Sequence, residues 1–205
     1  MSRYYVGTQA WLCGLNGLTL QLLAPLLAIV GQVWPGDPEH LGYAARSVAL
    51  RMLNEEEADR IGLAAYVCNI GMVGVLERLV AKAGPLTLEE RRVMGGHALA
   101  GARMLRGWEE IDPAMGEIAL AVQHHHERWD GRGYPDGLQG DAIPLASRVI
   151  CVAEAYQAML SPRPYREPRS METAKARITA AAGAQFDPDV AAALIAWRSA
   201  EEGSP

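Results

Sequence analysis

Apolar residues recur along most of the chain at the three- and four-residue spacing that places them on one face of a helix. The segment LASRVICVAEAYQAML, Leu145 to Leu160, shows this spacing throughout its length. No stretch alternates apolar and polar residues over the length of a strand, so the pattern predicts no sheet. We therefore expect an all-α fold in which short breaks separate the helices.

Helix start signals divide the chain into elements. Asp-Pro pairs, which supply a capping carboxylate and a proline at the first helical position, predict helix starts at 37–38, 112–113 and 187–188. The first of these helices is expected to reach about Leu53. Capping-box pairs predict two more helices, where Asn54 precedes Glu57 and Thr87 precedes Glu90. A further helix is expected to begin at Ser170 and to end at Gly183.

The segment from Trp11 to Trp34 is long and apolar enough to raise the question of a membrane helix. Polar residues and a proline interrupt it, namely Asn16, Gln21, Pro25 and Gln32. The preceding MSRYY has a single basic residue and no small-residue cleavage site follows, which argues against a signal peptide. We expect a core helix of a soluble domain and no insertion into a membrane.

Composition narrows the class of protein. The 205 residues suit a single domain, and 50% apolar with 21% charged residues is typical of a globular chain. The formal net charge of −5 and the lack of a long basic run argue against nucleic acid as a partner. Cys13, Cys68 and Cys151 are odd in number and far apart, which indicates a reducing compartment, the cytoplasm, rather than a disulfide framework.

Candidate chemistry concentrates in QHHHERWDGRGYPDG, Gln123 to Gly137, where three histidines precede a glycine-rich stretch. Neutral imidazole is a common ligand for zinc and iron. Because consecutive helical residues point about 100° apart, three in a row cannot all face one ion, although two at a helix end can. The alternative is a polar helix end, where imidazolium interacts favourably with the helix dipole. The glycine-rich region from Trp129 to Pro144 is expected to be a functional loop.

The stretch from His125 to Val149 closely resembles the signature of the HD-GYP family, which are all-helical proteins of the HD superfamily that hydrolyse the bacterial messenger cyclic di-GMP at a centre of two or three metal ions. The motif HHExxDGxGYP is matched by His125, His126, Glu127, Asp130, Gly131, Gly133, Tyr134 and Pro135. The resemblance continues through SPRPYR (161–166) and AQFDPDV (184–190) and reaches back to about Leu18. It implies an HD-superfamily helical bundle over residues 18–205 with an extended glycine-rich GYP loop, preceded by an N-terminal extension, 1–17.

The chain departs from the family pattern in the other half of the metal centre. The family has a stretch of type HDxGKxxx where this chain has CNIGMVGV, so that Cys68, Asn69 and Met72 replace His, Asp and Lys. Glu154 and Gln157 replace the two aspartates of the family's ADxxDAL stretch. An amide at position 69 is neutral and offers one carbonyl oxygen, so it is a poor bridge between two ions. Met72 carries no charge, which removes a phosphate contact.

The resemblance assigns two ligand sets to the centre. The first set becomes His40, Cys68, Asn69 and Glu154, which is badly depleted, whereas the second keeps its three histidines, His97, His125 and His126. His124 falls on a variable position of the family pattern and is not expected to be a ligand. Cys68 is either a thiolate ligand or a small buried apolar residue, and Glu154 either reaches an ion or is solvated. We therefore expect one divalent metal ion (iron, manganese or zinc) or none, and no two-ion site.

Two further surfaces follow from the resemblance. Arg163 and Arg166 match family positions that contact substrate phosphates, and their alternative is a pair of solvated surface arginines. The loop with Trp129, Arg132, Tyr134 and Pro135 is similar to the segment through which the family is thought to meet diguanylate cyclase domains of the GGDEF type. The alternative for the loop is a structural turn that its glycines permit.

The function expected from the sequence is that of a degenerate HD-GYP domain in bacterial cyclic di-GMP signalling. It would bind a nucleotide or a protein partner, or form a homodimer, rather than hydrolyse the messenger. The first alternative is an active or weakly active metal-dependent phosphodiesterase in which Cys68 and Glu154 are substitute ligands. The second is a protein-interaction module without a nucleotide.

Overall fold

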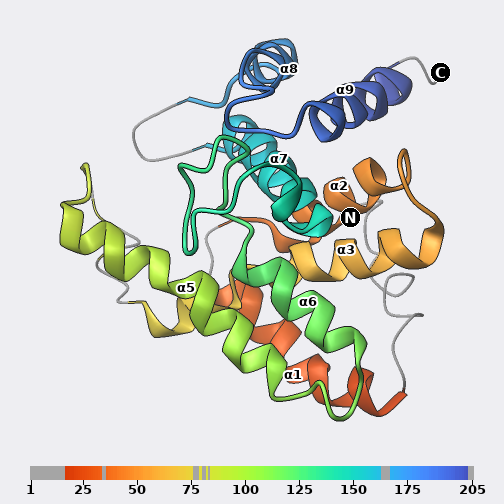
Figure 1. Ribbon diagram of the computed structural model, residues 1–205, viewed down its shortest axis with the longest axis vertical. Helices are drawn as coiled ribbons and strands as arrows, with labels where there is room; N and C mark the ends of the chain where they lie inside the picture. The colour runs from red at the N-terminus through yellow and green to blue at the C-terminus, as the bar shows by residue number, and fades with distance from the viewer. Residues whose placement is uncertain are drawn as a thin grey trace.

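The computed structural model describes residues 17–33, 36–75, 79, 82, 84–162 and 167–202, so most of the expected N-terminal extension lies outside the described residues. Within these ranges the chain forms helices and no β-strand, and one isolated bridge joins Ala182 to Phe186. The all-α prediction is therefore confirmed (Figure 1). The elements are α1 (Gly17–Val33), α2 (Pro38–Ala49), α3 (Glu55–Val67), η2 (Ile70–Gly74), α5 (Leu88–Arg106), α6 (Ala114–Gln123), η3 (Gly140–Ala142), α7 (Leu145–Leu160), α8 (Met171–Ala180) and α9 (Pro188–Glu202).

The capping signals determine where most helices begin. Thr87 and Glu90 form a full capping box at α5, in which each side chain bonds the other's backbone N–H. The side chains of Asp37, Asn54 and Ser170 accept backbone N–H groups at the starts of α2, α3 and α8.

Three helix boundaries differ from the sequence-based expectation. α6 begins at Ala114, one residue after the expected proline, although Asp112 still accepts the Ala114 N–H. α2 ends at Ala49 because backbone bonds from Met52 and Leu53 to the Ala49 carbonyl close a turn there instead of continuing the helix. α8 ends at Ala180, and the turn that follows includes Gly183 at a φ of +79°.

α1 joins the hydrophobic core, as the apolar segment suggested, but its described side chains do so along one face of the helix. Leu23 and Val30 are fully buried, but Pro25, Ile29 and Gln32 are exposed, so α1 contacts the bundle through one face. Residues 11–16 and 34 of the same segment lie outside the described part of the chain. Among the described helices, none is long and apolar enough to cross a membrane.

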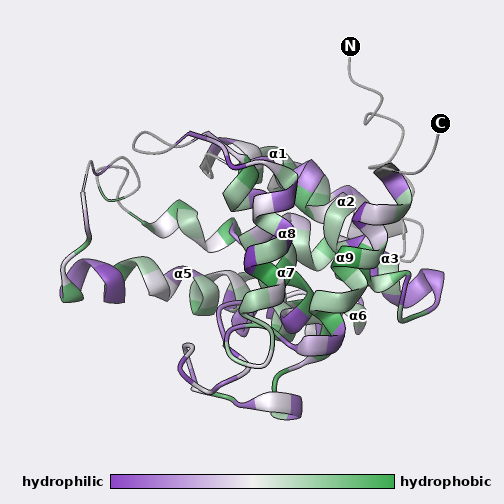
Figure 2. Cartoon of the chain, turned by 90° about the horizontal axis from the view of Figure 1, so that it is seen from above, coloured by the Kyte–Doolittle hydropathy of each residue, from purple (hydrophilic) through white to green (hydrophobic). Residues whose placement is uncertain are grey.

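α7 is the central helix of the bundle, and it contacts α2, α3, α6, α8 and α9 (Figure 1). Its inward face buries Val149, Val152 and Tyr156, which form part of one continuous hydrophobic core. Figure 2 shows hydrophobic residues gathered on α7 and α9, whereas hydrophilic residues dominate the first turns of α5, which project from the bundle. The Gln157 side chain is also buried here, and its amide donates to the Asp37 carbonyl at 2.6 Å. Gln157 therefore ties α7 to the start of α2 and has a structural role.

The short helix η2 lies directly against α5. A Cβ atom at Gly71 would lie 2.0 Å from the His97 carbonyl oxygen and 2.6 Å from the Gly101 nitrogen. Only glycine fits between the two backbones at this distance. Because Cys68 and Asn69 immediately precede η2, this contact brings them beside the turn of α5 that carries His97.

We expect Gly71→Ala to lower the free energy of unfolding by about 1–3 kcal/mol, because the added methyl group meets backbone that cannot rotate away. Gly74→Ala is the matched control, since Gly74 lies in the same short helix and a Cβ there meets nothing within 4 Å. Urea unfolding of the two variants measures the difference. Equal unfolding free energies would contradict the close packing of η2 on α5.

Candidate metal centre

Three imidazoles converge where α5 meets the end of α6. His97 lies on α5, and His125 and His126 lie in the turn that follows α6. The Nε2 atom of His97 is 3.3 Å from Nε2 of His125 and 3.2 Å from Nε2 of His126. Two imidazole nitrogens that bind the same tetrahedral zinc ion lie about 3.3 Å apart. Two of the three nitrogen–nitrogen distances therefore match the separation around a single divalent ion, and all three ligand atoms lie within 4.8 Å of one another.

Hydrogen bonds to backbone carbonyls hold two of these rings in the tautomer that a metal ligand requires. The Nδ1 atoms of His97 and His125 each lie 2.6 Å from a backbone carbonyl, those of Met94 and Val122 respectively. A carbonyl oxygen only accepts, so Nδ1 carries the proton and the Nε2 lone pair faces the centre. Two lone pairs that face one another repel, and a cation between them removes that repulsion.

Burial keeps the three rings neutral. It lowers the pKa of His97 to about 4, with the neighbouring His125 as a second cause. Burial also lowers the pKa of His125 and, together with the other two rings, the pKa of His126. Neutral imidazole is the form that binds metal ions, so no proton has to be displaced near neutral pH.

A second group of side chains lies next to the imidazoles. Cys68, His125 and Glu154 each offer a ligand atom, and these atoms lie within 4.8 Å of one another. Glu154 Oε2 is also 4.0 Å from Nδ1 of His126. Two of the positions where the chain departs from the family pattern, 68 and 154, therefore lie together in the structure and share His125 with the first group.

Asn69 supplies a hydrogen-bond donor inside this second group. Its Nδ2 atom donates to Glu154 Oε1 at 3.1 Å and to Cys68 Sγ at 3.3 Å. The amide therefore lies between the sulfur and the carboxylate, where a cation held by the same two atoms would have to lie. The amide oxygen, Oδ1, is buried without a hydrogen-bond partner. This arrangement stabilises the Glu154 carboxylate with a neutral group.

The environment of Cys68 disfavours a thiolate. The residue is fully buried, and burial followed by the nearby Glu154 carboxylate raises the pKa of the Cys68 thiol well above its usual value. Cys68 packs within the hydrophobic core, as its alternative interpretation from the sequence described.

Other expected site residues have different surroundings. His40 is half-buried near the start of α2 and belongs to none of the groups of described residues that could hold a metal ion. Met72 is buried in η2 and does not face solvent. Arg163 and Arg166, expected to contact phosphates, lie outside the described residues.

The loop from 127 to 144 is anchored to the end of α6 by Glu127. This side chain is fully buried, and its Oε1 accepts the backbone N–H groups of Asp136 and Gly137 at 2.7 and 3.0 Å. Gly133 passes so close that a Cβ there would lie 2.4 Å from the Glu127 Cα. The Glu127 carboxylate therefore joins the start of the loop to residues 136 and 137.

An ion pair shapes the beginning of the loop. Arg128 donates two bonds to Asp130, at 2.9 and 2.7 Å, and the Asp130 carboxylate also accepts the Arg132 N–H. The Arg128 hydrogen bonds are the largest cause that lowers the pKa of Asp130 to about 2. Asp130 of the motif is therefore a structural residue of the turn.

Tyr134 covers the imidazoles from the loop side. Its ring centroid is 4.9 Å from that of His126, and a Cβ at Gly95 of α5 would lie 3.2 Å from the tyrosine ring. Burial and the Glu154 carboxylate raise the pKa of Tyr134, so its hydroxyl stays protonated. Its side chain is still 39% exposed, so it contacts both the candidate centre and solvent.

Trp129 and Arg132 differ in their surroundings. The Trp129 backbone donates to the Gln185 carbonyl and accepts from Gly140, and the Arg148 guanidinium lies 5.6 Å from its ring centre. Arg132 and Pro135 are exposed on the loop. Trp129 therefore stabilises the loop, whereas Arg132 is available at its surface.

Sequence reasoning missed two roles in the site. Glu127 was matched as part of the motif, but its function as the anchor of the loop depends on backbone groups nine and ten residues later. The bond from Asn69 to Glu154 spans 85 positions, and no local pattern signals it. A glutamate directly before a glycine-rich loop is the signal that would have indicated the first role.

The helices and the imidazole cluster define an all-helical protein with a candidate metal centre beside a glycine-rich loop. A family model described as an HD domain matches residues 21–190. The chain is 40% identical over 162 residues to the cyclic di-GMP phosphodiesterase response regulator RpfG of Xanthomonas campestris. This alignment covers 78% of the chain and 42% of that relative, so the chain spans less than half of the relative's length.

Two solved structures share the fold. A cyclic GMP-AMP specific phosphodiesterase of Vibrio cholerae superposes with a TM-score of 0.65 at 19% identity, over 89% of this chain and 48% of that one. Bd1817, an HD-GYP-type protein of Bdellovibrio bacteriovorus, superposes with a TM-score of 0.62 at 14% identity, over 80% of this chain and 51% of that one. The chain belongs to the HD domain family, in the HD-GYP group whose motif it carries.

Proposed function

We propose that this chain is a degenerate HD-GYP domain that acts in cyclic di-GMP signalling by binding a nucleotide or protein partner rather than by hydrolysis. The observation that carries the proposal is the position of the Asn69 amide between Cys68 Sγ and Glu154 Oε1. Hydrolysis at a two-ion centre needs an anionic bridge there, and an amide that donates hydrogen bonds cannot supply one.

The sharing of His125 supports at most one ion in this centre. His125 belongs both to the group with His97 and His126 and to the group with Cys68 and Glu154. Its Nδ1 is engaged by the Val122 carbonyl, so only Nε2 is free to bind a metal ion. One nitrogen lone pair serves one ion, and the two groups therefore compete for it.

The three-histidine group is the better candidate of the two. The His97 nitrogen already lies from each of the other two nitrogens at about the separation that an ion needs, whereas the second group would have to expel the Asn69 amide and deprotonate Cys68. An ion bound to the histidines would supply a polarised water molecule. The chain itself contributes fixed imidazole orientation and, through Tyr134, partial exclusion of solvent.

A second candidate function is a metal-dependent phosphodiesterase that works with substitute ligands. The observation in its favour is the proximity of Cys68, His125 and Glu154, whose ligand atoms lie within 4.8 Å of one another. The name of the Xanthomonas relative, a cyclic di-GMP phosphodiesterase, is compatible with this candidate as well.

Metal content and turnover separate the two functions. We expect native protein, purified anaerobically and offered iron, manganese or zinc, to hold one ion in this centre and to hydrolyse cyclic di-GMP very slowly or not at all. The occupancy of the centre is the metal content of the native protein minus that of His97→Ala, which removes a ligand of the proposed ion. His40→Ala is the matched control, since His40 lies in none of the groups.

Two ions in the centre together with several turnovers per minute would refute the proposal and favour the phosphodiesterase. Asn69→Asp alone is expected to leave turnover unchanged, because Cys68 still lacks the imidazole of the family pattern. The combination of Asn69→Asp with Cys68→His is expected to raise occupancy towards two, and adding Met72→Lys tests the phosphate contact.

Nucleotide binding is proposed to depend on Arg163 and Arg166, since guanidinium suits bidentate recognition of phosphate. Calorimetry with cyclic di-GMP, with and without added manganese, measures the affinity, and a cyclic GMP-AMP titration tests the choice of nucleotide. We expect Arg163→Ala or Arg166→Ala to weaken binding by roughly tenfold or more, because hydrogen bonds to charged groups are lost. Arg177→Ala, at an exposed position on α8, is the control. If native protein binds neither nucleotide, an interaction module without a nucleotide replaces this part of the proposal.

The exposed face of the loop is the proposed contact for a GGDEF-type domain. Arg132→Ala is expected to weaken capture of such a domain without changing the melting temperature, because Arg132 is exposed. Trp129→Ala is expected to lower the melting temperature, because its ring packs beside Arg148. Gln139→Ala is the control for an exposed loop position. Capture that is unaffected by Arg132→Ala would contradict the proposal, and light scattering on the same samples reports whether the chain dimerises instead.

A further inference from the structure

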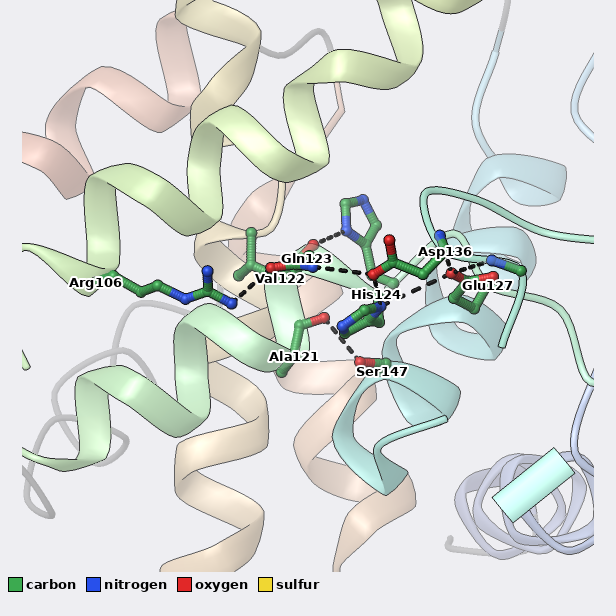
Figure 3. Close-up of polar contacts among 10 residues, drawn as sticks. Arg106, Ala121, Val122, Gln123, His124, Glu127, Asp136 and Ser147 are labelled. Carbon is green, nitrogen blue, oxygen red and sulfur yellow. Dashed lines mark hydrogen bonds and ion pairs between the residues drawn. The ribbon is translucent and has the colours of Figure 1, made fainter. Parts of the chain in front are cut away.

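A second histidine-carboxylate group lies at the base of the loop, apart from the three imidazoles. It comprises His124, which caps the C-terminus of α6, together with Glu127 and Asp136 (Figure 3). Its ligand atoms lie within 4.8 Å of one another. None of these residues belongs to the groups that contain His97 or Cys68.

Two polar atoms in this group are buried without a hydrogen-bond partner. His124 Nδ1 is one of them, on a side chain that is only 6% exposed. The other is Glu127 Oε2, on a side chain that is 0% exposed. Buried polar groups in folded proteins are almost always satisfied, so each of these atoms calls for a partner.

The distances suit an intervening cation better than a direct hydrogen bond. His124 Nδ1 is 3.6 Å from Asp136 Oδ2 and 3.8 Å from Glu127 Oε1. N–H···O hydrogen bonds have nitrogen–oxygen distances of about 2.7–3.2 Å. By contrast, a nitrogen and an oxygen bound to one tetrahedral zinc ion are separated by about 3.4 Å. The imidazole therefore points at both carboxylates from a distance that leaves room for an ion.

Neighbouring side chains fix the exposed member of the group. Gln123 Nε2 donates to Asp136 Oδ2 at 3.1 Å, and Arg106 Nη2 donates to Gln123 Oε1 at 2.6 Å (Figure 3). Asp136 is 51% exposed, so the group opens to solvent on that side. Water can complete the coordination of an ion there, and the two carboxylates would balance the charge of a divalent cation.

We propose that His124, Glu127 and Asp136 form a second divalent-cation site, which takes a zinc-like or manganese-like ion and clamps the loop to the end of α6. One imidazole nitrogen with two carboxylate oxygens is a ligand set of this class of ion. The inference goes beyond the proposed function and holds whether or not the three imidazoles bind a metal. Tyr134 lies two residues before Asp136 and covers His126, so the clamp also orders the cover of the centre.

Zinc binding in a His97→Ala background tests the proposal, because that change removes a ligand of the other centre. Equilibrium dialysis is expected to find one zinc ion per chain in this variant. Asp136→Asn in the same background is expected to weaken zinc binding at least tenfold. Asp141→Asn is the matched control, since Asp141 is an exposed acid of the same loop that pairs with Arg148 instead.

A second measurement keeps the test independent of the His97 variant. In otherwise native protein, Asp136→Asn and His124→Gln are each expected to remove one zinc ion per chain while the ion at the imidazoles stays. Zinc is also expected to slow amide hydrogen exchange at residues 130–137 in native protein, and not in Asp136→Asn. The proposal is overturned if Asp136→Asn binds zinc as tightly as the protein without that change. It is also overturned if native protein binds zinc and His97→Ala binds none. The first outcome leaves the proposed function untouched, because occupancy of the imidazole centre is measured separately.

Discussion

The contact between the Gly71 backbone and the His97 turn of α5 is the constraint on which the candidate centre depends. It places η2 against α5 without an intervening side chain, and so fixes Cys68 and Asn69, which connect α3 to η2, beside His97. The packing of α6 on α5 then brings His125 and His126 to the same point. The packing of η2, α5 and α6 on one another therefore determines the geometry of the candidate centre and the positions of its ligand atoms.

Within that geometry, charge decides what the centre can do. The three imidazoles are neutral and bring no negative charge, so one divalent ion among them would remain largely uncompensated by protein. The Glu154 carboxylate, 4.0 Å from Nδ1 of His126, already accepts from the Asn69 amide. Two ions a few ångströms apart repel strongly in a partly buried site, and nothing at position 69 offsets that repulsion. A carboxylate in place of the Asn69 amide would therefore change the electrostatic balance of the candidate centre.

The sequence predicted the helices well where local chemistry determines them. Caps at Asp37, Thr87 and Ser170 mark helix starts, and Leu145–Leu160 matches α7 at both ends. The sequence pattern was less informative where burial depends on distant elements. The outer face of α1, for example, is exposed although the segment is apolar. The grouping of His97 with two later histidines came from the family motif, since no periodicity relates residues on different helices. The donor role of Asn69 and the pairing of His124 with Asp136 required the folded chain.

The loop is anchored by Glu127, a side chain that is not one of the candidate ligands among the imidazoles. The bonds of Glu127 go to the main chain of residues 136 and 137, so this anchor of the loop involves none of the side chains at positions 68, 69 and 72. Under the proposed function, replacements at those three positions would alter the metal centre while the surface around Arg132 and Pro135 keeps its form. On the same proposal, a few substitutions would suffice to exchange turnover for recognition without rebuilding the surface that a partner would meet.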